Sequence, residues 1–341
     1  MKRSLLALAL LASVSATAVA EPPGLITRDI SAPHHGRAMD IAVWYPAENG
    51  QETTFAESPV FKGGPVREGA APRAGKHPVV LLSHGMGGSF LSLNWLATGL
   101  VSHNAVVIAV NHPNGSFHDR HPKKMFDHWT RAQDLEVALE DVLADKTLSA
   151  VIDPSRVYAA GFSFGGWTVL SLAGVRGRLE NSLSYCADAP KRATPCTDLS
   201  TFGVNRQQTN HAAWSASYKD ARIRAVAAID PGLTHGLTPD DVRDVDQKGL
   251  LLIGLGQGED RLYATDTSDD GSGFEALVPG AKVENLVPAS HFTAMPICKP
   301  EGAHILVKEK DDPVCTDPAG GNRQDVHDRI IALVAQHFGL D

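Results

Sequence analysis

Several features that mark specialised classes of protein are scarce or absent in this chain of 341 residues. It has only four cysteines and no Cys-x-x-Cys pair, which argues against a zinc site built on cysteines. Its 31 basic residues are outnumbered by 39 acidic ones, and a net charge of −8 argues against nucleic acid as a partner. After the N-terminal segment no apolar run approaches the ~20 residues that a membrane-spanning helix needs, so we expect no stable membrane insertion.

The N-terminal segment differs from the rest of the chain. "MKRSLLALALLASVSATAVAE" begins with two basic residues near its start, continues with a short apolar stretch and has Ala-Val-Ala just before Glu21. This order is typical of a secretory signal peptide with an A-x-A cleavage site. We therefore expect residues 1–20 to be removed by cleavage near Ala20 and the protein to be periplasmic or secreted. A retained N-terminal anchor is the alternative.

All four cysteines lie after that segment, at Cys186, Cys196, Cys298 and Cys315. In an oxidising compartment an even number of cysteines predicts disulfides. Proximity in the sequence favours the pairs Cys186–Cys196 and Cys298–Cys315, although three connectivities are open. Each closed loop would stabilise the fold by ~2–4 kcal/mol.

Apolar runs alternate with amphipathic stretches over most of the chain. Continuous apolar runs are typical of strands buried on both faces of a parallel sheet. They predict strands at "RAMDIAVWYPA", "HPVVLLSHG", "NAVVIAVNH", "RVYAAGF", "RIRAVAAID", "GLLLIGLG" and "AKVENLVPASH". Helices are predicted around 91–102, at "WTRAQDLEVALEDVLAD", from Ser163 to Leu172 and at "NRQDVHDRIIALVAQHFG". The alternation predicts an α/β fold in which helices flank a mostly parallel central sheet.

One predicted helix has a clear apolar face. In "WTRAQDLEVALEDVLAD" this face carries Leu135, Leu139, Val142 and Leu143. We expect the acidic and basic residues of this helix on the opposite, solvated face.

The sequence Gly161-Phe162-Ser163-Phe164-Gly165 matches G-x-S-x-G and lies between a predicted strand and a predicted helix. That context is typical of a nucleophile elbow, a strained turn that lifts a serine hydroxyl clear of the sheet at a helix N-terminus. The residues two before and two after the serine must be small, and here both are glycine. We therefore expect Ser163 to be a nucleophile. An ordinary strand–helix connection with a chance match is the alternative.

A serine hydroxyl needs a general base, and the base needs an acid that orients it. With the serine on such an elbow, the chain order is serine, acid, histidine. Between the last predicted strand and the closing helix lie His291 in "PASHFTA" and His304 in "EGAHILV". We expect His291 to be the base, because it ends an apolar strand and begins a loop.

The acid has three candidates. Asp230 in "AVAAIDPG" lies at the carboxyl end of the strand after the elbow helix, and Pro231 would end that strand and hold the carboxylate at the sheet edge. Glu259 and Asp260 follow the next strand, which is the commoner place for the acid. We favour Asp230 and keep the other two as alternatives.

A glycine-rich loop completes the predicted site. "LLSHGMGGS" follows a buried strand, where this kind of fold supplies one of two backbone N–H donors for an oxyanion. We expect the donors to be the N–H groups of Met86 and Phe164. Losing one such donor typically costs ~3–4 kcal/mol of transition-state stabilisation. A plain glycine-rich loop is the alternative.

In this order, "LLSHGMGGS", "GFSFGG", "RIRAVAAIDPG" and "HFTAMPIC…VC" resemble the platelet-activating-factor acetylhydrolase-like α/β-hydrolases, which include bacterial proteins labelled predicted dienelactone hydrolases. The resemblance extends from about Ala42 to the C-terminal helix. It implies an α/β-hydrolase fold, Asp230 as the acid of the triad, and Met86 and Phe164 as the oxyanion donors. True dienelactone hydrolases use a cysteine nucleophile, whereas this chain has Ser163.

Together these residues predict a serine esterase for small or short-acyl esters that works through an acyl-enzyme, with Ser163, Asp230 and His291 as its triad. The expected partner is a small-molecule ester, and no cofactor is expected. A lactonase, a peptidase or a polyester hydrolase could use the same triad. A catalytically inactive hydrolase fold that binds a ligand is the alternative from another class.

Two stretches interrupt the strand–helix alternation. Residues 48–76 are rich in glycine and proline, and residues 176–220 are polar, contain the first cysteine pair and show no clear period. No internal repeat or second domain is visible. We therefore expect residues 21–341 to form a single domain, in which residues 176–220 are an insertion over the active site.

Other histidines and the tryptophans suggest no further function. The histidines in question are His34, His35, His112, His118, His121 and His128. Their spacing fits no standard set of metal ligands, so we expect solvated polar loops and no metal site. Core packing is the expected role of Trp95, Trp129, Trp167 and Trp214, rather than contact with lipid.

Overall fold

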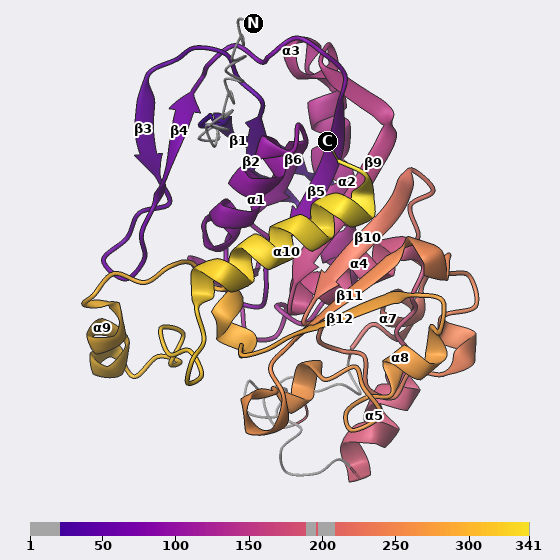
Figure 1. The fold of residues 1–341 in the computed structure, drawn as a ribbon. Helices are drawn as coiled ribbons and strands as arrows, with labels where there is room; N and C mark the ends of the chain where they lie inside the picture. The colour runs from indigo at the N-terminus through magenta and orange to yellow at the C-terminus, as the bar shows by residue number, and fades with distance from the viewer. Residues whose placement is uncertain (1–20, 189–195, 197–208, 341) are drawn as a thin grey trace, which may run out of the picture.

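The computed structural model describes residues 21–188, 196 and 209–340. In this part of the chain ten strands form one sheet, which crosses the molecule from edge to edge (Figure 1). In spatial order its strands are β12 (Lys282–Leu286), β11 (Leu250–Leu255), β10 (Ile223–Ile229), β9 (Ile152–Phe162), β5 (His77–Ser83), β6 (Val106–Val110), β2 (Arg37–Tyr45), β1 (Gly24–Ala32), β4 (Gly64–Glu68) and β3 (Glu52–Phe55).

The strands from β12 to β6 all pair in parallel, whereas β2 pairs antiparallel with both β6 and β1. Every residue of β5, β6 and β11 is buried. Parallel strands are covered by helices on both faces, and this is why these strands are continuous apolar runs in the sequence. The predicted α/β fold with a mostly parallel central sheet is therefore confirmed.

Helices cover both faces of the sheet. Side chains alternate along a strand, so Val79 and Leu81 of β5 join one core cluster and their neighbours Val80 and Leu82 join the other. The first cluster includes apolar residues of α2 (His128–Ala144) and α4 (Phe164–Ala173). The second includes those of α1 (Asn94–Ser102) and α10 (Arg323–Phe338), which lie side by side in front of the sheet in Figure 1. Each of the four predicted helices is present.

The N-terminal edge of the sheet holds strands that the sequence pattern did not predict. β1 pairs with β2 along its whole length, and β3 and β4 form an antiparallel pair inside the glycine- and proline-rich stretch 48–76. Most residues of β3 and β4 are exposed or half-buried, and only Val66 is buried. Edge strands with one wet face carry few apolar residues, so they lack the signal that identifies a buried strand.

The expected insertion at residues 176–220 is described only in part. It contains α5 (Leu179–Asp188) and α7 (His211–Ser215), and these two helices contact each other. Residues 189–195 and 197–208 of the insertion lie outside the described residues. Its place over the active site stays a prediction.

Short elements connect the longer ones. They are β7 (Gly115–Ser116), β8 (Asp119–Arg120), α3 (Lys146–Ser149), α8 (Phe274–Leu277), α9 (Gly302–Glu309), η1 (Pro33–His35), η2 (Phe90–Leu93), η4 (Pro239–Asp241), η5 (Gln247–Gly249), η6 (Gly258–Asp260), η7 (Tyr263–Thr265) and η8 (His291–Ala294). None of the helices in the described ranges combines the length and the apolar character needed to cross a bilayer.

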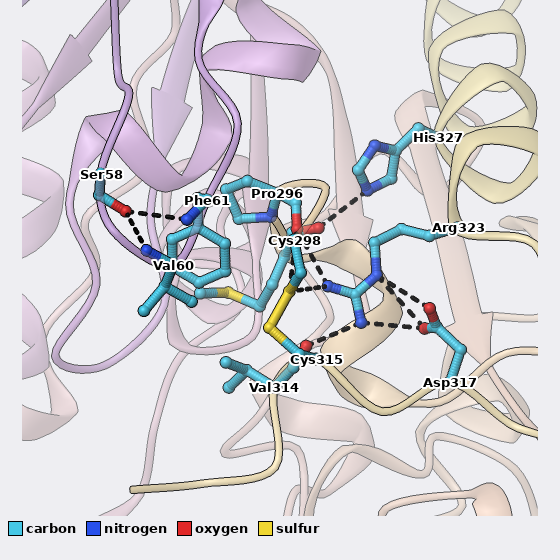
Figure 2. Close-up of a disulfide and its surroundings, with 11 residues drawn as sticks. Ser58, Val60, Phe61, Pro296, Cys298, Val314, Cys315, Asp317, Arg323 and His327 are labelled. Atoms are coloured by element: carbon cyan, nitrogen blue, oxygen red, sulfur yellow. Dashed lines mark hydrogen bonds and ion pairs between the residues drawn. A yellow bond between two sulfur atoms is a disulfide. The ribbon is translucent and has the colours of Figure 1, made fainter. Parts of the chain in front are cut away.

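Two disulfides join Cys186 to Cys196 and Cys298 to Cys315. Figure 2 shows the second one, with the Arg323 guanidinium of α10 beside it. This guanidinium donates to the carbonyl oxygens of Pro296 and Val314, so it bonds to the chain next to each cysteine. The disulfide and Arg323 together hold the C-terminal segment in place before α10 begins.

Candidate active site

Ser163 lies on a strained turn between β9 and α4. Its backbone has φ 58° and ψ −119°, a conformation that residues with a side chain rarely adopt. Glycine is required on both sides: a Cβ on Gly161 would lie 2.2 Å from the Gly165 carbonyl oxygen, and one on Gly165 would lie 2.0 Å from the Ser83 carbonyl oxygen. The turn therefore has the geometry of a nucleophile elbow.

Asp230 and His291 meet beside this turn, although 61 residues separate them. Asp230 follows β10, and His291 is the first residue of η8. The Nδ1 atom of His291 lies 2.6 Å from Asp230 Oδ2, and because a carboxylate only accepts, Nδ1 carries the hydrogen. The free nitrogen of the imidazole is then Nε2, the atom that a general base would use.

The Asp230 carboxylate is fully buried and is held by groups from the next strand and loop. The Leu255 N–H donates to Oδ1 at 3.0 Å, and the Thr265 hydroxyl donates to Oδ2 at 2.7 Å. The Arg261 guanidinium lies 3.7 Å from Oδ1. These contacts fix the carboxylate in one orientation, which in turn orients the His291 ring.

The elbow and the histidine are in contact through Phe162, the residue before Ser163. The Phe162 ring packs on the His291 imidazole with 4.7 Å between ring centroids. Within the described residues no hydrogen bond joins the Ser163 hydroxyl to His291. Catalytic hydrogen bonds are often long in the absence of substrate and shorten when it binds.

The loop after β5 lies against the elbow. A Cβ on Gly85 would be 3.2 Å from the Ser163 Cβ, so the loop backbone passes directly beside the serine. Among the described residues, the N–H groups of Met86 and Phe164 donate no hydrogen bond. Both are therefore available as donors to an oxyanion.

A buried arginine that the sequence pattern did not single out joins this loop to the elbow helix. Arg131 of α2 donates to the His84 carbonyl oxygen, and its Nε donates to the Thr168 hydroxyl of α4 at 3.0 Å. That hydroxyl donates to the Phe164 carbonyl oxygen at 3.0 Å. Burial lowers the pKa of Arg131 to about 9. One side chain thus contacts both segments that carry the expected oxyanion donors, one directly and one through Thr168.

A chain of buried polar groups continues from the same loop. The Ser83 hydroxyl lies 2.8 Å from His112 Nε2, and His112 Nδ1 lies 2.8 Å from Asp134 Oδ2. The His112 N–H donates to His84 Nε2 at 3.2 Å. Burial lowers the pKa of His112 to about 4 and that of His84 well below its usual range, so both rings are neutral.

Two sequence-based expectations about polar residues are wrong, one about histidines and one about the charges of α2. His112 and His128 are 1% exposed rather than solvated, and His35 has a side chain that is 4% exposed. Arg131 and Asp134 lie on the buried face of α2, not on the opposite one. The sequence does contain a pattern that predicts the burial of Arg131 and Asp134. Helical spacing places both charges on the apolar face, together with residues 135, 138, 139 and 142.

Within the described residues the alternative site residues form no hydrogen bond with Ser163 or His291. Glu259 and Asp260 are exposed in η6, and His304 is exposed in α9.

Trp167 and Trp214 are buried as expected, whereas Trp95 and Trp129 are half-buried. The sequence did not suggest Thr265 or Arg261. Thr265 ends η7 and Arg261 follows η6, and the polar composition of this segment gives no indication of their contacts.

Comparisons with known proteins agree with this architecture. A family model described as "Alpha/beta hydrolase family" matches residues 79–297, and the chain belongs to that family. The protein is therefore a hydrolase by family, and the fold expected from the resemblance is confirmed.

Individual similar proteins match either a small part of this chain or the whole fold at low sequence identity. Lipase 1 of Moraxella sp. (strain TA144) is 38% identical over 82 residues, which cover 24% of this chain and 23% of that lipase. A ferulic acid esterase from Streptomyces cinnamoneus has the same fold, with a TM-score of 0.54 and 19% identity over 95% of this chain and 91% of that one. A dienelactone hydrolase from Anabaena variabilis ATCC 29413 has a TM-score of 0.46 and 14% identity, over 85% of this chain and 96% of that one.

Proposed function

We propose that the protein is a serine hydrolase of carboxylic esters that works through an acyl-enzyme. The observation that carries the proposal is the 2.6 Å pair of His291 with the buried Asp230, in which the His291 ring packs on Phe162, the residue before a serine on a strained strand–helix turn. A strained backbone at one residue persists only where its surroundings hold it, and such residues cluster at functional sites. Two similar proteins, a lipase and a ferulic acid esterase, support an ester as the substrate class.

In the proposed reaction His291 Nε2 takes the proton from Ser163 as the serine oxygen attacks the ester carbonyl carbon. Asp230 keeps Nδ1 protonated and stabilises the imidazolium that forms. The tetrahedral oxyanion accepts hydrogen bonds from the N–H groups of Met86 and Phe164. The imidazolium then protonates the leaving alcohol, and a water molecule repeats the cycle on the acyl-enzyme.

The preference for short acyl groups is carried over from the family resemblance, because the small pocket near the elbow helix is lined by neither Ser163 nor His291. A pocket lined mainly by apolar atoms, with Trp167, Trp214 and Leu233 in its wall, has a free volume of about 30 Å³. A single water needs ~10–15 Å³ on this scale, so the pocket holds about two water-sized groups. Trp167 lies one helical turn after Ser163, and Leu233 follows Gly232, whose N–H donates to the Ser163 carbonyl oxygen.

Export is part of the proposal. The signal-like residues 1–20 and two disulfides together favour the periplasm or the outside of the cell. We propose residues 21–341 as the single mature domain.

A panel of p-nitrophenyl esters tests the proposed activity and the acyl preference. We expect turnover of the acetate and propionate esters and a steep fall in kcat/KM at longer acyl chains, as the family resemblance implies. Ser163→Ala should reduce kcat by roughly 10⁴-fold or more without loss of folding, checked by circular dichroism. An acetylated phospholipid, a lactone, a peptide and a polyester, tested in parallel, distinguish among substrates that share the triad.

Two results would count against the proposal. Full turnover by Ser163→Ala would remove the serine from the mechanism. A folded wild-type protein that binds esters but hydrolyses none would favour the inactive binding protein.

A further inference from the structure

A second cluster of ionisable side chains lies away from Ser163, at the turn between β1 and β2. His34 and His35 belong to η1, and Asp134 belongs to α2. The Nε2 atoms of His34 and His35 lie 2.7 Å and 2.8 Å from the same carboxylate oxygen, Asp134 Oδ1. One ligand atom from each of the three residues fits within 4.8 Å.

Neighbouring residues in a chain usually direct their side chains apart, but these two imidazoles converge. Pro33 begins the turn, and Gly36 ends it with φ 65° and an N–H that donates to the Pro33 carbonyl oxygen at 3.0 Å. The two rings lie 4.4 Å apart. Hydrogen-bond donors from unrelated positions are enough for a buried carboxylate. Chelation of a metal ion instead requires nitrogen atoms that converge on one point. The turn supplies that arrangement.

The carboxylate is also held from its other side. Asp134 is fully buried, and its Oδ2 lies 2.8 Å from His112 Nδ1. Metal ligands typically have an outer hydrogen bond of this kind, which fixes their orientation. Oδ1 is therefore presented to the two imidazoles in a constant position.

We propose that His34, His35 and Asp134 bind one divalent transition-metal ion, with Zn²⁺ the best fit and water in the remaining position. Two imidazoles and one carboxylate are a typical ligand set for zinc with an open site. The His34 side chain is 16% exposed, so the cluster has a route to solvent. Asp119 and Asp127 interact electrostatically with His35, and Glu136 interacts with His34, while Asp119 is also paired with Arg37.

Ion binding changes little in the cluster. Zinc bonds of about 2.0–2.1 Å in tetrahedral geometry separate ligand atoms by about 3.3 Å, so each histidine moves outward by a fraction of an ångström. For the ion to bind, each Nε2 must give up the hydrogen that it donates to Asp134, and the metal-bound imidazole then carries its hydrogen on Nδ1. The ion then replaces the two hydrogen bonds to Oδ1 and links the β1–β2 turn to α2.

Metal binding to the full mature chain, with any affinity tag removed, tests the proposal. After treatment with a chelator and dialysis, zinc is titrated by calorimetry, and the melting temperature is measured with and without zinc. We expect one equivalent bound with a Kd of roughly 1 μM or tighter, and a rise in Tm of roughly 5 °C at a hundredfold excess over Kd. Cobalt in place of zinc should give the intense visible absorption of a four-coordinate ion.

Matched variants separate this cluster from other histidines. His34→Gln and His35→Gln keep an amide N–H that can donate to Asp134 but remove the imidazole ligand, so they should fold and lose the bound equivalent. His118→Gln and His304→Gln change exposed histidines and should retain it. If folded wild-type protein shows no saturable zinc binding, or if His34→Gln and His35→Gln bind as tightly as wild type, the cluster is a hydrogen-bond network only and the proposal is overturned.

Discussion

Among single residues, Asp230 has the surroundings that bear most on the proposed chemistry. Its buried carboxylate accepts from Leu255, Thr265 and His291, and the Arg261 guanidinium is near. A carboxylate fixed in this way can hold the imidazole in one tautomer and stabilise the imidazolium. Glu259 and Asp260, which the sequence allowed as alternatives, are exposed.

Substitution of the three acids tests this assignment. We expect Asp230→Asn to lower kcat by roughly 10⁴-fold, because an amide favours the wrong imidazole tautomer. Asp260→Asn and Glu259→Gln, which make the same chemical change at exposed positions, should remain within about threefold of wild type, since surface changes of this kind perturb little. Steady-state kinetics on a p-nitrophenyl ester decides the matter. A larger loss in either exposed variant would reassign the acid.

His128 shows how burial of one titratable ring makes stability depend on pH. The ring is 1% exposed and contacts the Trp129, Trp167 and Trp214 rings edge to face. Burial lowers its pKa to about 3, and the Trp214 backbone offsets only part of this effect. The unfolded chain binds a proton at this histidine below its ordinary pKa near 6.5, whereas the folded chain does not until about pH 3. The contribution to stability is therefore lost as pH falls from about 6.5 to 3.

Replacing this ring with one that cannot titrate should remove that pH dependence. When the pH falls from 7.5 to 4.5, the unfolding free energy of wild type should decrease by roughly 2–3 kcal/mol more than that of His128→Phe. Urea unfolding at both pH values measures the difference. An equal loss in the two proteins would show that His128 does not contribute to acid sensitivity.

Among the elements, α2 has a role beyond packing. Its Arg131 bonds to the His84 carbonyl oxygen and to Thr168, and the guanidinium lies 4.7 Å from the centre of the Phe164 ring. The loop after β5 and the N-terminus of α4 are thus held at a constant separation by one side chain. Because the expected oxyanion donors lie on these two segments, α2 sets their relative position.

Removing the hydrogen bonds of Arg131 should impair turnover more than substrate binding. We expect Arg131→Met to lower kcat by roughly 10²-fold with KM within about threefold, because displaced donors weaken transition-state stabilisation selectively. Arg131→Lys keeps a charge but cannot bond to both partners, so it should give an intermediate kcat. Thermal unfolding of each variant controls for loss of fold. A change in KM alone would show that Arg131 acts in binding or folding instead.

The elements differ in how far the sequence reveals them. Buried strands such as β5 and β11 are uninterrupted apolar runs, and the G-x-S-x-G motif after β9 marks the elbow, so both could be predicted. β3 and β4 could not, because mostly exposed edge strands lack an apolar pattern.

The same distinction applies to the candidate site. Ser163, Asp230 and His291 each follow a predicted strand, and strand ends of a parallel sheet gather at one edge. Thr265 and the contacts of Arg131 depend on tertiary packing between segments far apart in the chain. Histidines 34 and 35 are adjacent, but only the fold brings Asp134 to them.

At the scale of the whole molecule, the last segment of the chain is tied back to its beginning. The backbone of residues 60–62 pairs with that of residues 297–299 through two hydrogen bonds of 2.8 Å, next to the Cys298–Cys315 disulfide (Figure 2). Asp317 links this region to the site, because it accepts from Thr293 of η8 and pairs with Arg323. The position of η8, and with it His291, thus depends on contacts between distant parts of the chain.

The central claim is that Ser163 is an activated nucleophile, and labelling with a fluorophosphonate tests it most directly. The reagent phosphonylates a serine only when a general base activates it, and it requires no knowledge of the natural ester. We predict one adduct per chain by intact-mass spectrometry, mapped to Ser163, and none in Ser163→Ala or after denaturation. A folded wild-type protein that stays unlabelled, or an adduct on another residue, would contradict the account.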